Sequence, residues 1–198
     1  MINGHFVCQR RFDAAHALSL IESHSITNLY LVPTLYHDLL SHEAFANSNV
    51  TTVRKLGFAG QAMTDGLLKK LQTAFNLDLF VNHYGSSEIY TFTIEPDAPA
   101  KPGSAGKAGL NQEIRVIKLD SIDADDLVEG DDEGQIIAAL DGDEAFEGYW
   151  KRPEADAKSL HDGWYFTGDV GYQDNDGDLF VTGRVDDMII SGGENILP

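Results

Sequence analysis

The chain has 198 residues, of which 14 are Lys or Arg and 32 are Asp or Glu, so its formal charge is −18. Hydrophobic residues make up 42% of the sequence and aromatic residues 10%, a composition that suits one substantial core or two small ones and disfavours disorder over most of the chain. A charge this negative disfavours nucleic acid and anionic membrane surfaces as main partners, because both attract basic faces.

The cysteine content and the first residues predict the compartment. The single Cys8 cannot form an internal disulfide, and the polar start at Met1–Gly4 lacks the apolar core of a signal peptide. No apolar run approaches the roughly 18 residues that span a bilayer. We therefore expect a soluble cytoplasmic protein without a membrane span.

The N-terminal part of the chain alternates between helical and strand patterns. Apolar residues recur with helical spacing over Phe12–His24, which predicts an amphipathic helix. Ile26–Val32 then predicts a short buried strand that Pro33 ends. A second helix is expected to follow, with Thr34 as its N-cap.

The same alternation continues downstream. Leu56–Ala59 predicts a second strand, Thr64 caps a helix whose apolar face runs over Leu67–Phe75, and Leu79–Val81 predicts a third strand. This order predicts a mostly parallel α/β sheet. Because ligands bind at the carboxyl ends of such strands, the loops after Ala59 and Val81 are the first places to look for chemistry.

After about Thr93 the pattern changes to a β-rich unit. Proline and glycine punctuate a stretch without helical periodicity, and an acidic run from Asp120 to Glu133 separates two predicted strands. A solvated surface loop is the favoured interpretation of this run, and a cation site is the alternative. The predicted strands are Glu113–Leu119, Gln135–Leu140, Asp178–Thr182 and Met188–Ile190.

Several patterns fail as cofactor or metal sites. A calcium loop beginning at Asp174 needs Gly at its sixth position and a carboxylate at its twelfth, where Leu179 and Val185 stand, so Asp174–Asp178 is better explained as a tight hairpin turn. His37 and His42 are five positions apart, a spacing that disfavours a shared zinc site on one helix face. No dinucleotide fingerprint is formed by the spaced glycines Gly103, Gly106 and Gly109.

Three polar motifs remain that no requirement of the fold explains. The first, Asn82–Glu88, lies where the third predicted strand ends. Its glycine lets two hydroxyls approach phosphate oxygens, Glu88 can hold a hard cation such as magnesium, and Tyr84 offers a flat face to a base. A loop that caps a helix explains this motif equally well when it is taken alone.

The other two motifs are Gly163–Asp169 and Gly183–Asn195. In the former, Asp169 follows a predicted glycine turn, where a carboxylate can accept hydrogen bonds from the vicinal hydroxyls of a ribose. Each motif alone could be a turn. The three in this order and at these separations indicate one common function.

Together the three motifs resemble the adenylate-forming superfamily of acyl- and aryl-CoA synthetases, adenylation domains and luciferases, and the third is most similar to the CoA-ligase branch. Supporting stretches are Val32–Thr34, Phe58–Gly60 with Met63, and Phe146–Trp150. The resemblance implies ATP-dependent conversion of a small-molecule carboxylic acid to an acyl-adenylate and transfer of the acyl group to CoA, with Mg²⁺ as the metal.

The resemblance also implies a role for individual positions. Ser87 would contact phosphate, Glu88 would bind magnesium, and Arg184 would reach the ribose or phosphate. Asp186 matches a hinge. The remaining nucleotide- and CoA-binding positions implied by the family pattern are Gly60, Gln61, Asn82, Tyr84, Asp169, Gly192 and Gly193. The acyl pocket would be lined by His83, Gly85, Tyr90 and Thr91.

As a fold, the resemblance implies part of a large domain: a partial α/β subdomain at 1–95, a distorted β-barrel at 96–183, and a hinge with the start of a further domain at 184–198. The family's phosphate loop and its catalytic lysine have no counterpart in these 198 residues. We therefore expect a carboxylic acid–CoA ligase for an aromatic or medium-sized acid, present as a truncated, inactive piece.

Two alternatives to a CoA ligase are an adenylation domain that loads a carrier protein and a non-catalytic binding module. Self-association is also expected, because an incomplete sheet exposes an apolar edge.

Overall fold

The computed structural model describes residues 4–187, 189–191 and 194–196. The chain forms two compact units, the first comprising residues 1–82 and 96–102 and the second residues 83–95 and 103–198. The subdomains expected at 1–95, 96–183 and 184–198 divide the chain differently, and that division stays a prediction. Within the described residues, no helix is both long and apolar enough to cross a membrane.

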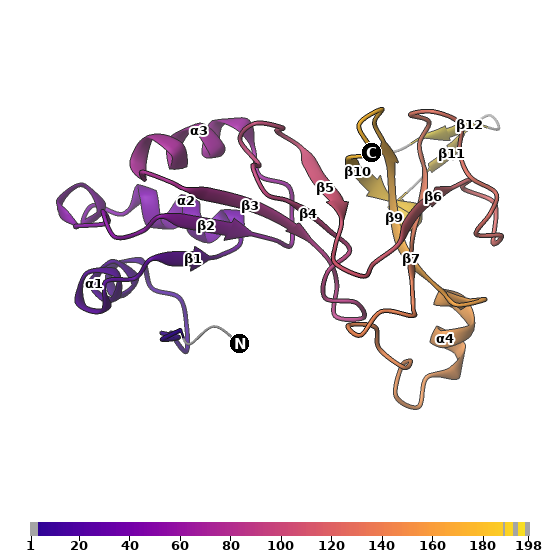
Figure 1. Cartoon of the computed structure of the whole chain (residues 1–198), viewed down its shortest axis with the longest axis horizontal. Coiled ribbons are helices and arrows are strands. Elements are labelled where there is room, and N and C mark those ends of the chain that lie inside the picture. The colour runs from indigo at the N-terminus through magenta and orange to yellow at the C-terminus, as the bar shows by residue number, and fades with distance from the viewer. Residues whose placement is uncertain (1–3, 188, 192–193, 197–198) are drawn as a thin grey trace. The chain divides into compact units, whose positions relative to one another are not determined.

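The first unit is a parallel sheet with helices between its strands (Figure 1). The middle strand pairs in parallel with a strand on each side, which confirms the predicted α/β alternation. The strands are β1 (Asn28–Tyr30), β2 (Lys55–Phe58) and β3 (Leu79–Tyr84). The helices are α1 (Ala14–His24), α2 (Pro33–Ser41), the 3-10 helix η1 (Phe45–Asn47) and α3 (Asp65–Ala74).

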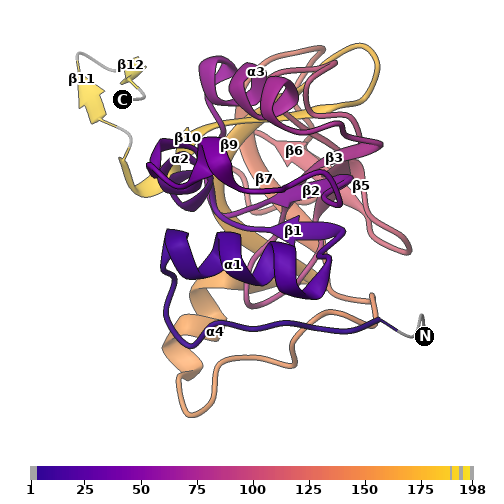
Figure 2. The ribbon, with the colours of Figure 1, turned by 90° about the vertical axis from the view of Figure 1, so that its left-hand side faces the viewer.

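All three α-helices of this unit contribute to one core against the sheet (Figure 2). Tyr36 of α2 is fully buried, and its hydroxyl shares its proton between the carbonyl oxygens of Leu29 and Gly57, at 3.0 and 2.9 Å. Because Leu29 lies on β1 and Gly57 on β2, this side chain ties α2 to both strands. The other core residues include Leu18, Ile21, Leu39, Leu56, Phe58, Leu68, Leu71 and Phe80.

Of the two N-cap residues predicted from the sequence, one is confirmed and one is wrong. The hydroxyl of Thr64 accepts a hydrogen bond from the backbone N–H of Leu67, so Thr64 is the N-cap of α3 as predicted. The prediction that Thr34 caps the second helix is wrong, because α2 begins at Pro33 and has no side-chain cap. Proline suits the first helical position, since its fixed φ is already helical and it has no N–H to leave unsatisfied.

Strand β3 runs further than its apolar residues predict. Its parallel pairing with β2 brings Asn82 opposite Phe58, and the strand ends only at Tyr84. The start of the first polar motif is therefore part of the strand rather than of the loop after it. Backbone hydrogen bonds along the ladder extend the strand through residues whose side chains are polar.

The second unit is an antiparallel sheet with the strand order β4-β5-β10-β9-β7-β6, and β8 pairs with β9. Its core cluster includes Ile89, Phe92, Ile136 and Leu179. The strands are β4 (Thr93–Glu95), β5 (Ser104–Ala108), β6 (Ile114–Ile117), β7 (Gly134–Ala139), β8 (Leu160–His161), β9 (Trp164–Gln173) and β10 (Leu179–Arg184). The helical segments are α4 (Pro153–Ser159) and η2 (Val185–Asp187).

The predicted strands at 113–119, 135–140 and 178–182 are confirmed as β6, β7 and β10. The one predicted at Met188–Ile190 corresponds to β11 (Ile189–Ser191), which pairs with β12 (Glu194–Ile196), while Met188 lies outside the described residues. The sequence pattern missed β4, β5, β8, β9, β12 and α4. Glycines interrupt the apolar sequence pattern of β9, although the strand itself is continuous. At Gly171 the fold requires a glycine, because an added Cβ would lie 2.2 Å from the Phe180 carbonyl oxygen on β10.

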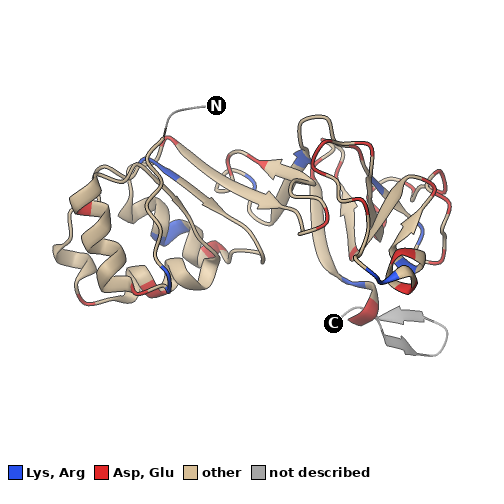
Figure 3. Ribbon diagram, turned by 90° about the horizontal axis from the view of Figure 1, so that it is seen from below, with Lys and Arg blue, Asp and Glu red and all other residues tan. Residues whose placement is uncertain are grey.

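The two acidic segments lie at turns and loops of the second unit (Figure 3). Asp174–Asp178 joins β9 to β10 as the predicted hairpin turn, with Gly177 at φ +81°. Carboxylate oxygens of Asp174, Asp176 and Asp178 lie within 4.8 Å of one another, and the first accepts hydrogen bonds from the backbone N–H groups of the other two. The run Asp120–Glu133 is mostly exposed, as expected of a solvated loop.

The buried face of α3 yields a stability prediction. Leu71 is fully buried in the core of the first unit, so Leu71→Ala is expected to lower its free energy of unfolding by about 2–5 kcal/mol. Urea unfolding followed by circular dichroism measures this loss. Leu110→Ala is the matched control, because Leu110 is 94% exposed and should leave stability unchanged. Equal effects of the two changes would contradict the burial of Leu71.

Candidate functional site

A bulge in β9 determines where Asp169 lies. The pairing of β9 with β7 shifts register between Gln135 and Ile137, opposite the segment Thr167–Asp169. Gly168 has φ +77°, a backbone conformation that glycine adopts without the steric cost of a Cβ. Asp169 therefore projects from a bulge inside a strand, and the prediction that it follows a glycine turn is wrong. Bulges of this kind re-aim a side chain next to functional sites.

The neighbouring Thr167 fixes the bulge. Its hydroxyl, which is buried, donates to the carbonyl oxygen of Ile136 on β7 at 2.9 Å and accepts from the backbone N–H of Asp169 at 3.0 Å. These two hydrogen bonds satisfy groups that the register shift removes from the regular ladder.

Asp169 links residues from all three polar motifs. Its Oδ2 accepts from the Tyr84 hydroxyl at 2.5 Å, and its Oδ1 accepts from Arg184 Nη1 at 2.7 Å. The Asp169 side chain is 16% exposed and that of Arg184 is 52% exposed, so this polar cluster opens to solvent on the arginine side. Burial, followed by the charge of Asp169 and the hydrogen bond to it, raises the pKa of Tyr84 far above its ordinary value. Tyr84 is therefore a neutral donor at physiological pH.

Glu88 is held in a tight turn of the first motif. Ser86 Oγ accepts from the backbone N–H of Glu88 at 3.1 Å and from that of Ile89 at 3.3 Å. Glu88 Oε1 accepts from the hydroxyl of Tyr149, at 2.8 Å. Burial acts to raise the pKa of Glu88, but the hydrogen bonds from Tyr149 and Ser86 outweigh it, and the pKa is lower than usual.

The state of Glu88 fits a hard cation. A carboxylate with a lowered pKa is ionised at neutral pH, and ionised carboxylate oxygens are the ligands that Mg²⁺ takes in proteins. Ser87 lies next to it in the turn, exposed, and among the described residues its hydroxyl makes no hydrogen bond. A ligand oxygen could therefore reach Ser87 without displacing an existing partner.

The residues expected around the acyl group lie together in the second unit. The ring of His83 is 9% exposed and meets Tyr90 edge to face, with 4.8 Å between the ring centroids. Burial lowers the pKa of His83, although a backbone hydrogen bond with Tyr90 and the charge of Glu144 oppose the effect. Gly85 leaves no room for a side chain, since an added Cβ would lie 1.9 Å from the Tyr90 carbonyl oxygen.

Thr91 lies next to this aromatic pair in the sequence and is half-buried. Its Cγ2 atom packs over Gly109, where an added Cβ would come within 2.7 Å of it.

Other predicted site residues belong to the first unit. Gly60 and Gln61 follow β2, and Asn82 lies opposite Phe58 near the end of β3, so the sheet brings these three to the same edge. Gly60 has φ +87°, which its lack of a Cβ permits. This confirms that the loop after β2 and the end of β3 share the carboxyl edge of the parallel sheet.

The third motif is described only in part. Arg184 ends β10, and Asp186 lies in η2 with its carboxylate 3.7 Å from the ammonium group of Lys158, both side chains being exposed. Gly192 and Gly193, for which a role beside the CoA channel is expected, lie outside the described residues.

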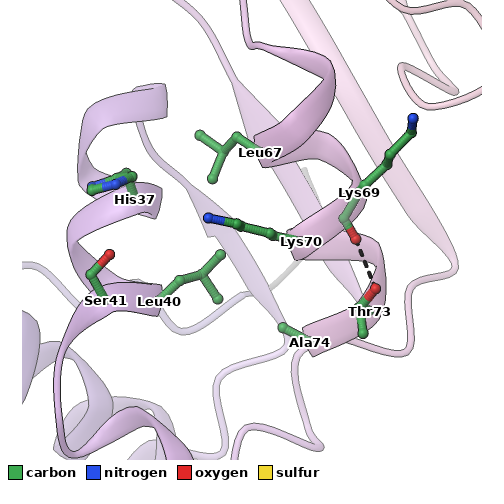
Figure 4. A pocket seen from close by; sticks show the side chains of 8 residues that line it. All are labelled: His37, Leu40, Ser41, Leu67, Lys69, Lys70, Thr73 and Ala74. Carbon is green, nitrogen blue, oxygen red and sulfur yellow. Dashed lines mark hydrogen bonds between the residues drawn. The ribbon is translucent and has the colours of Figure 1, made fainter.

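A pocket of about 470 Å³ lies away from these motifs, between α2 and α3 of the first unit (Figure 4). Leu40 and Leu67 face one another across it, and Lys70 projects between the two helices. None of the motif residues lines this pocket, so it is not the candidate site.

Sequence reasoning missed two contributors to the site. Thr167 was part of a motif but had no assigned role, and Tyr149 lies in the supporting stretch Phe146–Trp150 without a predicted function. No local pattern indicates the role of Tyr149, because its partner Glu88 lies 61 residues away in the chain.

Comparison with known proteins agrees with the three motifs. The model of the family of AMP-binding enzymes matches residues 1–150. The 4-chlorobenzoate–CoA ligase of Arthrobacter sp is 33% identical over 194 residues, which cover 98% of this chain and 36% of the ligase. The feruloyl-CoA synthase of Amycolatopsis sp is 32% identical over 198 residues, covering 98% of this chain and 39% of that protein.

A solved structure agrees as well. The O-succinylbenzoate–coenzyme A synthetase of Bacillus subtilis, in complex with ATP and a magnesium ion, superimposes with a TM-score of 0.80 at 31% identity, over 96% of this chain and 38% of the synthetase. The chain thus spans little more than a third of the length of each of these relatives. On the family match and on the motifs that carry the polar cluster, the chain belongs to the family of AMP-binding enzymes, whose large domain has this mixed α and β architecture.

Proposed function

We propose that this chain is part of a carboxylic acid–CoA ligase, which uses ATP and Mg²⁺ to convert an acid to its acyl-adenylate and then transfers the acyl group to CoA. The observation that carries the proposal is the polar cluster of Tyr84, Asp169 and Arg184, which joins all three family motifs at 2.5 and 2.7 Å. The relatives named above are CoA ligases or synthetases, which favours CoA over a carrier protein as the acyl acceptor.

The roles that we propose for the cluster and for the neighbouring Ser87 and Glu88 come from the family pattern and are compatible with the chemistry of each side chain. Asp169 accepts hydrogen bonds from the ribose hydroxyls, Tyr84 packs on the adenine, and Arg184 faces the ribose or phosphate. Ser87 contacts the phosphate and Glu88 binds Mg²⁺, which reduces the repulsion between the anionic acid and the anionic phosphates. The roles proposed for Gly60, Gln61, Asn82, Asp186, Gly192 and Gly193 rest on the family pattern.

An aromatic or medium-sized acid is the proposed substrate. The polar imidazole of His83 and the edge-to-face ring of Tyr90 suit an aromatic ring better than a long alkyl chain. The names of the relatives include chlorobenzoate, ferulate and succinylbenzoate, which are aromatic acids.

The first prediction separates this chain from the longer ligase that we propose contains it. ATP–pyrophosphate exchange with a panel of aromatic and medium-sized acids is expected from the full-length protein and not from the 198-residue chain, because the phosphate loop and the catalytic lysine of the family pattern have no counterpart in it. Exchange catalysed by the 198-residue chain would refute the requirement for those two elements. Thioester formation with free CoA, measured in parallel, distinguishes a CoA ligase from an adenylation domain that loads a carrier protein.

The second prediction concerns Asp169. Because this carboxylate accepts two hydrogen bonds and is proposed to accept those of the ribose, Asp169→Asn in the full-length protein is expected to raise the KM for ATP roughly tenfold or more. Initial rates of pyrophosphate exchange at varied ATP measure the effect. Asp132→Asn, at an exposed loop carboxylate, is the matched control and should leave the KM unchanged. An Asp169→Asn enzyme with the KM of the control would exclude Asp169 from nucleotide binding.

Self-association is a separate prediction, and it concerns the 198-residue chain. Tyr30 and Val32, at and just after β1, are 52% and 40% exposed, and burial of such apolar surface favours association. Sedimentation velocity at increasing concentration should show the sedimentation coefficient rising. A single species of monomer mass at every concentration would refute it.

A further inference from the structure

The segment 145–149 contacts both the backbone and the side-chain carboxylate of Glu88. The backbone N–H of Phe146 donates to the carbonyl oxygen of Glu88 at 2.8 Å, and Ala145 forms an antiparallel bridge with Ile89. Three residues after Phe146, the hydroxyl of Tyr149 donates to Glu88 Oε1 at 2.8 Å. The backbone and the carboxylate of Glu88 therefore take their positions from the same short segment, which comes from a distant part of the chain.

Tyr149 is itself fixed by its surroundings. Its ring meets that of Phe146 edge to face at 4.9 Å between centroids, and its backbone N–H donates to Asp156 Oδ1 in α4 at 2.8 Å. Gly148 has φ +140°, and a Cβ there would lie 3.2 Å from both carboxylate oxygens of Asp156. A hydroxyl held in this way is a pre-organised donor rather than a side chain that finds Glu88 by chance.

The hydroxyl of Tyr149 donates one hydrogen bond to the carboxylate of Glu88. A carboxylate oxygen has lone pairs for more than one partner, so a bond from Tyr149 leaves Glu88 able to bind a cation.

We infer that Tyr149 is a positioning residue for Glu88: its hydroxyl orients the carboxylate that binds Mg²⁺. This inference rests on the proposed function, because it takes Glu88 as the magnesium ligand. Mg²⁺ demands near-ideal octahedral geometry, and a glutamate side chain has several rotatable bonds, so a fixed second hydrogen bond favours the binding orientation.

The test compares the Mg²⁺ requirement of variants of the full-length protein. The Mg²⁺ dependence of ATP binding, followed by isothermal titration calorimetry, and that of ATP–pyrophosphate exchange are both measured for the parent, Tyr149→Phe, Glu88→Gln and Tyr172→Phe. Tyr172 stacks on Phe180 in the same unit, and its hydroxyl makes no hydrogen bond within the described residues, so it controls for loss of a tyrosine hydroxyl. Tyr149→Phe is expected to raise the half-saturating Mg²⁺ concentration roughly tenfold, and excess Mg²⁺ is expected to restore the rate. Tyr172→Phe is expected to leave the half-saturating Mg²⁺ concentration unchanged.

Each outcome decides one of the two claims. An unchanged Mg²⁺ requirement in Glu88→Gln refutes Glu88 as the ligand and with it the proposed role of the site. A raised requirement in Glu88→Gln together with a Tyr149→Phe curve like that of Tyr172→Phe overturns the inference alone. A lower maximal rate of Tyr149→Phe that excess Mg²⁺ does not restore also overturns it, because that result marks a purely structural role.

A second variant keeps the test decisive if Tyr149→Phe folds poorly. Asp156→Asn weakens the acceptor that holds the backbone of Tyr149 and leaves its hydroxyl in place. A smaller rise in the Mg²⁺ requirement is expected. Folded Asp156→Asn with an unchanged requirement counts against positioning through this segment.

Discussion

The left-handed backbone of Gly168 is the constraint on which the polar cluster of the second unit depends. Without it β9 would continue in regular register, and Asp169 would not project from a bulge toward Tyr84 and Arg184. The bulge is stabilised by Thr167, whose buried hydroxyl bonds to the backbone of Ile136 and of Asp169 in place of a ladder hydrogen bond. A strand that pairs on both sides thus presents a functional carboxylate at a defined place, which a mobile loop would do less well.

Charge plays a smaller part in the site than the composition suggests. The chain carries a formal charge of −18, yet its longest acidic run lies on an exposed loop, where Asp125 and Asp126 pair with Arg115 and Lys118. Exposed pairs of this kind contribute little to stability. Within the polar cluster, the guanidinium of Arg184 neutralises Asp169, so the acidity of the chain as a whole says little about the ligand of the site.

The predictable part of the site follows from short motifs, and the unpredictable part from long-range contacts. Glu88 and Asp169 stand in motifs that can be recognised in the sequence, because the residues that define them are neighbours in the chain. Tyr149 gives no comparable signal: its hydroxyl matters only because folding brings it 2.8 Å from a carboxylate 61 residues away. Nor does the sequence distinguish a bulge at Gly168 from a turn, since glycine permits both.

The sequence by itself determined the family, the helical periodicity of the first unit, the parallel order of its strands, the Thr64 cap and the hairpin turn at Asp174–Asp178. Each of these depends on residues close together in the chain or on a recurring apolar pattern. Only the tertiary structure decided that β9 is one long strand, that β3 extends through the polar Asn82, and that a distant tyrosine holds Glu88. The physical reason is that ladder hydrogen bonds and contacts between residues distant in the chain outweigh local propensity. Neither kind of interaction leaves a pattern among neighbouring residues of the sequence.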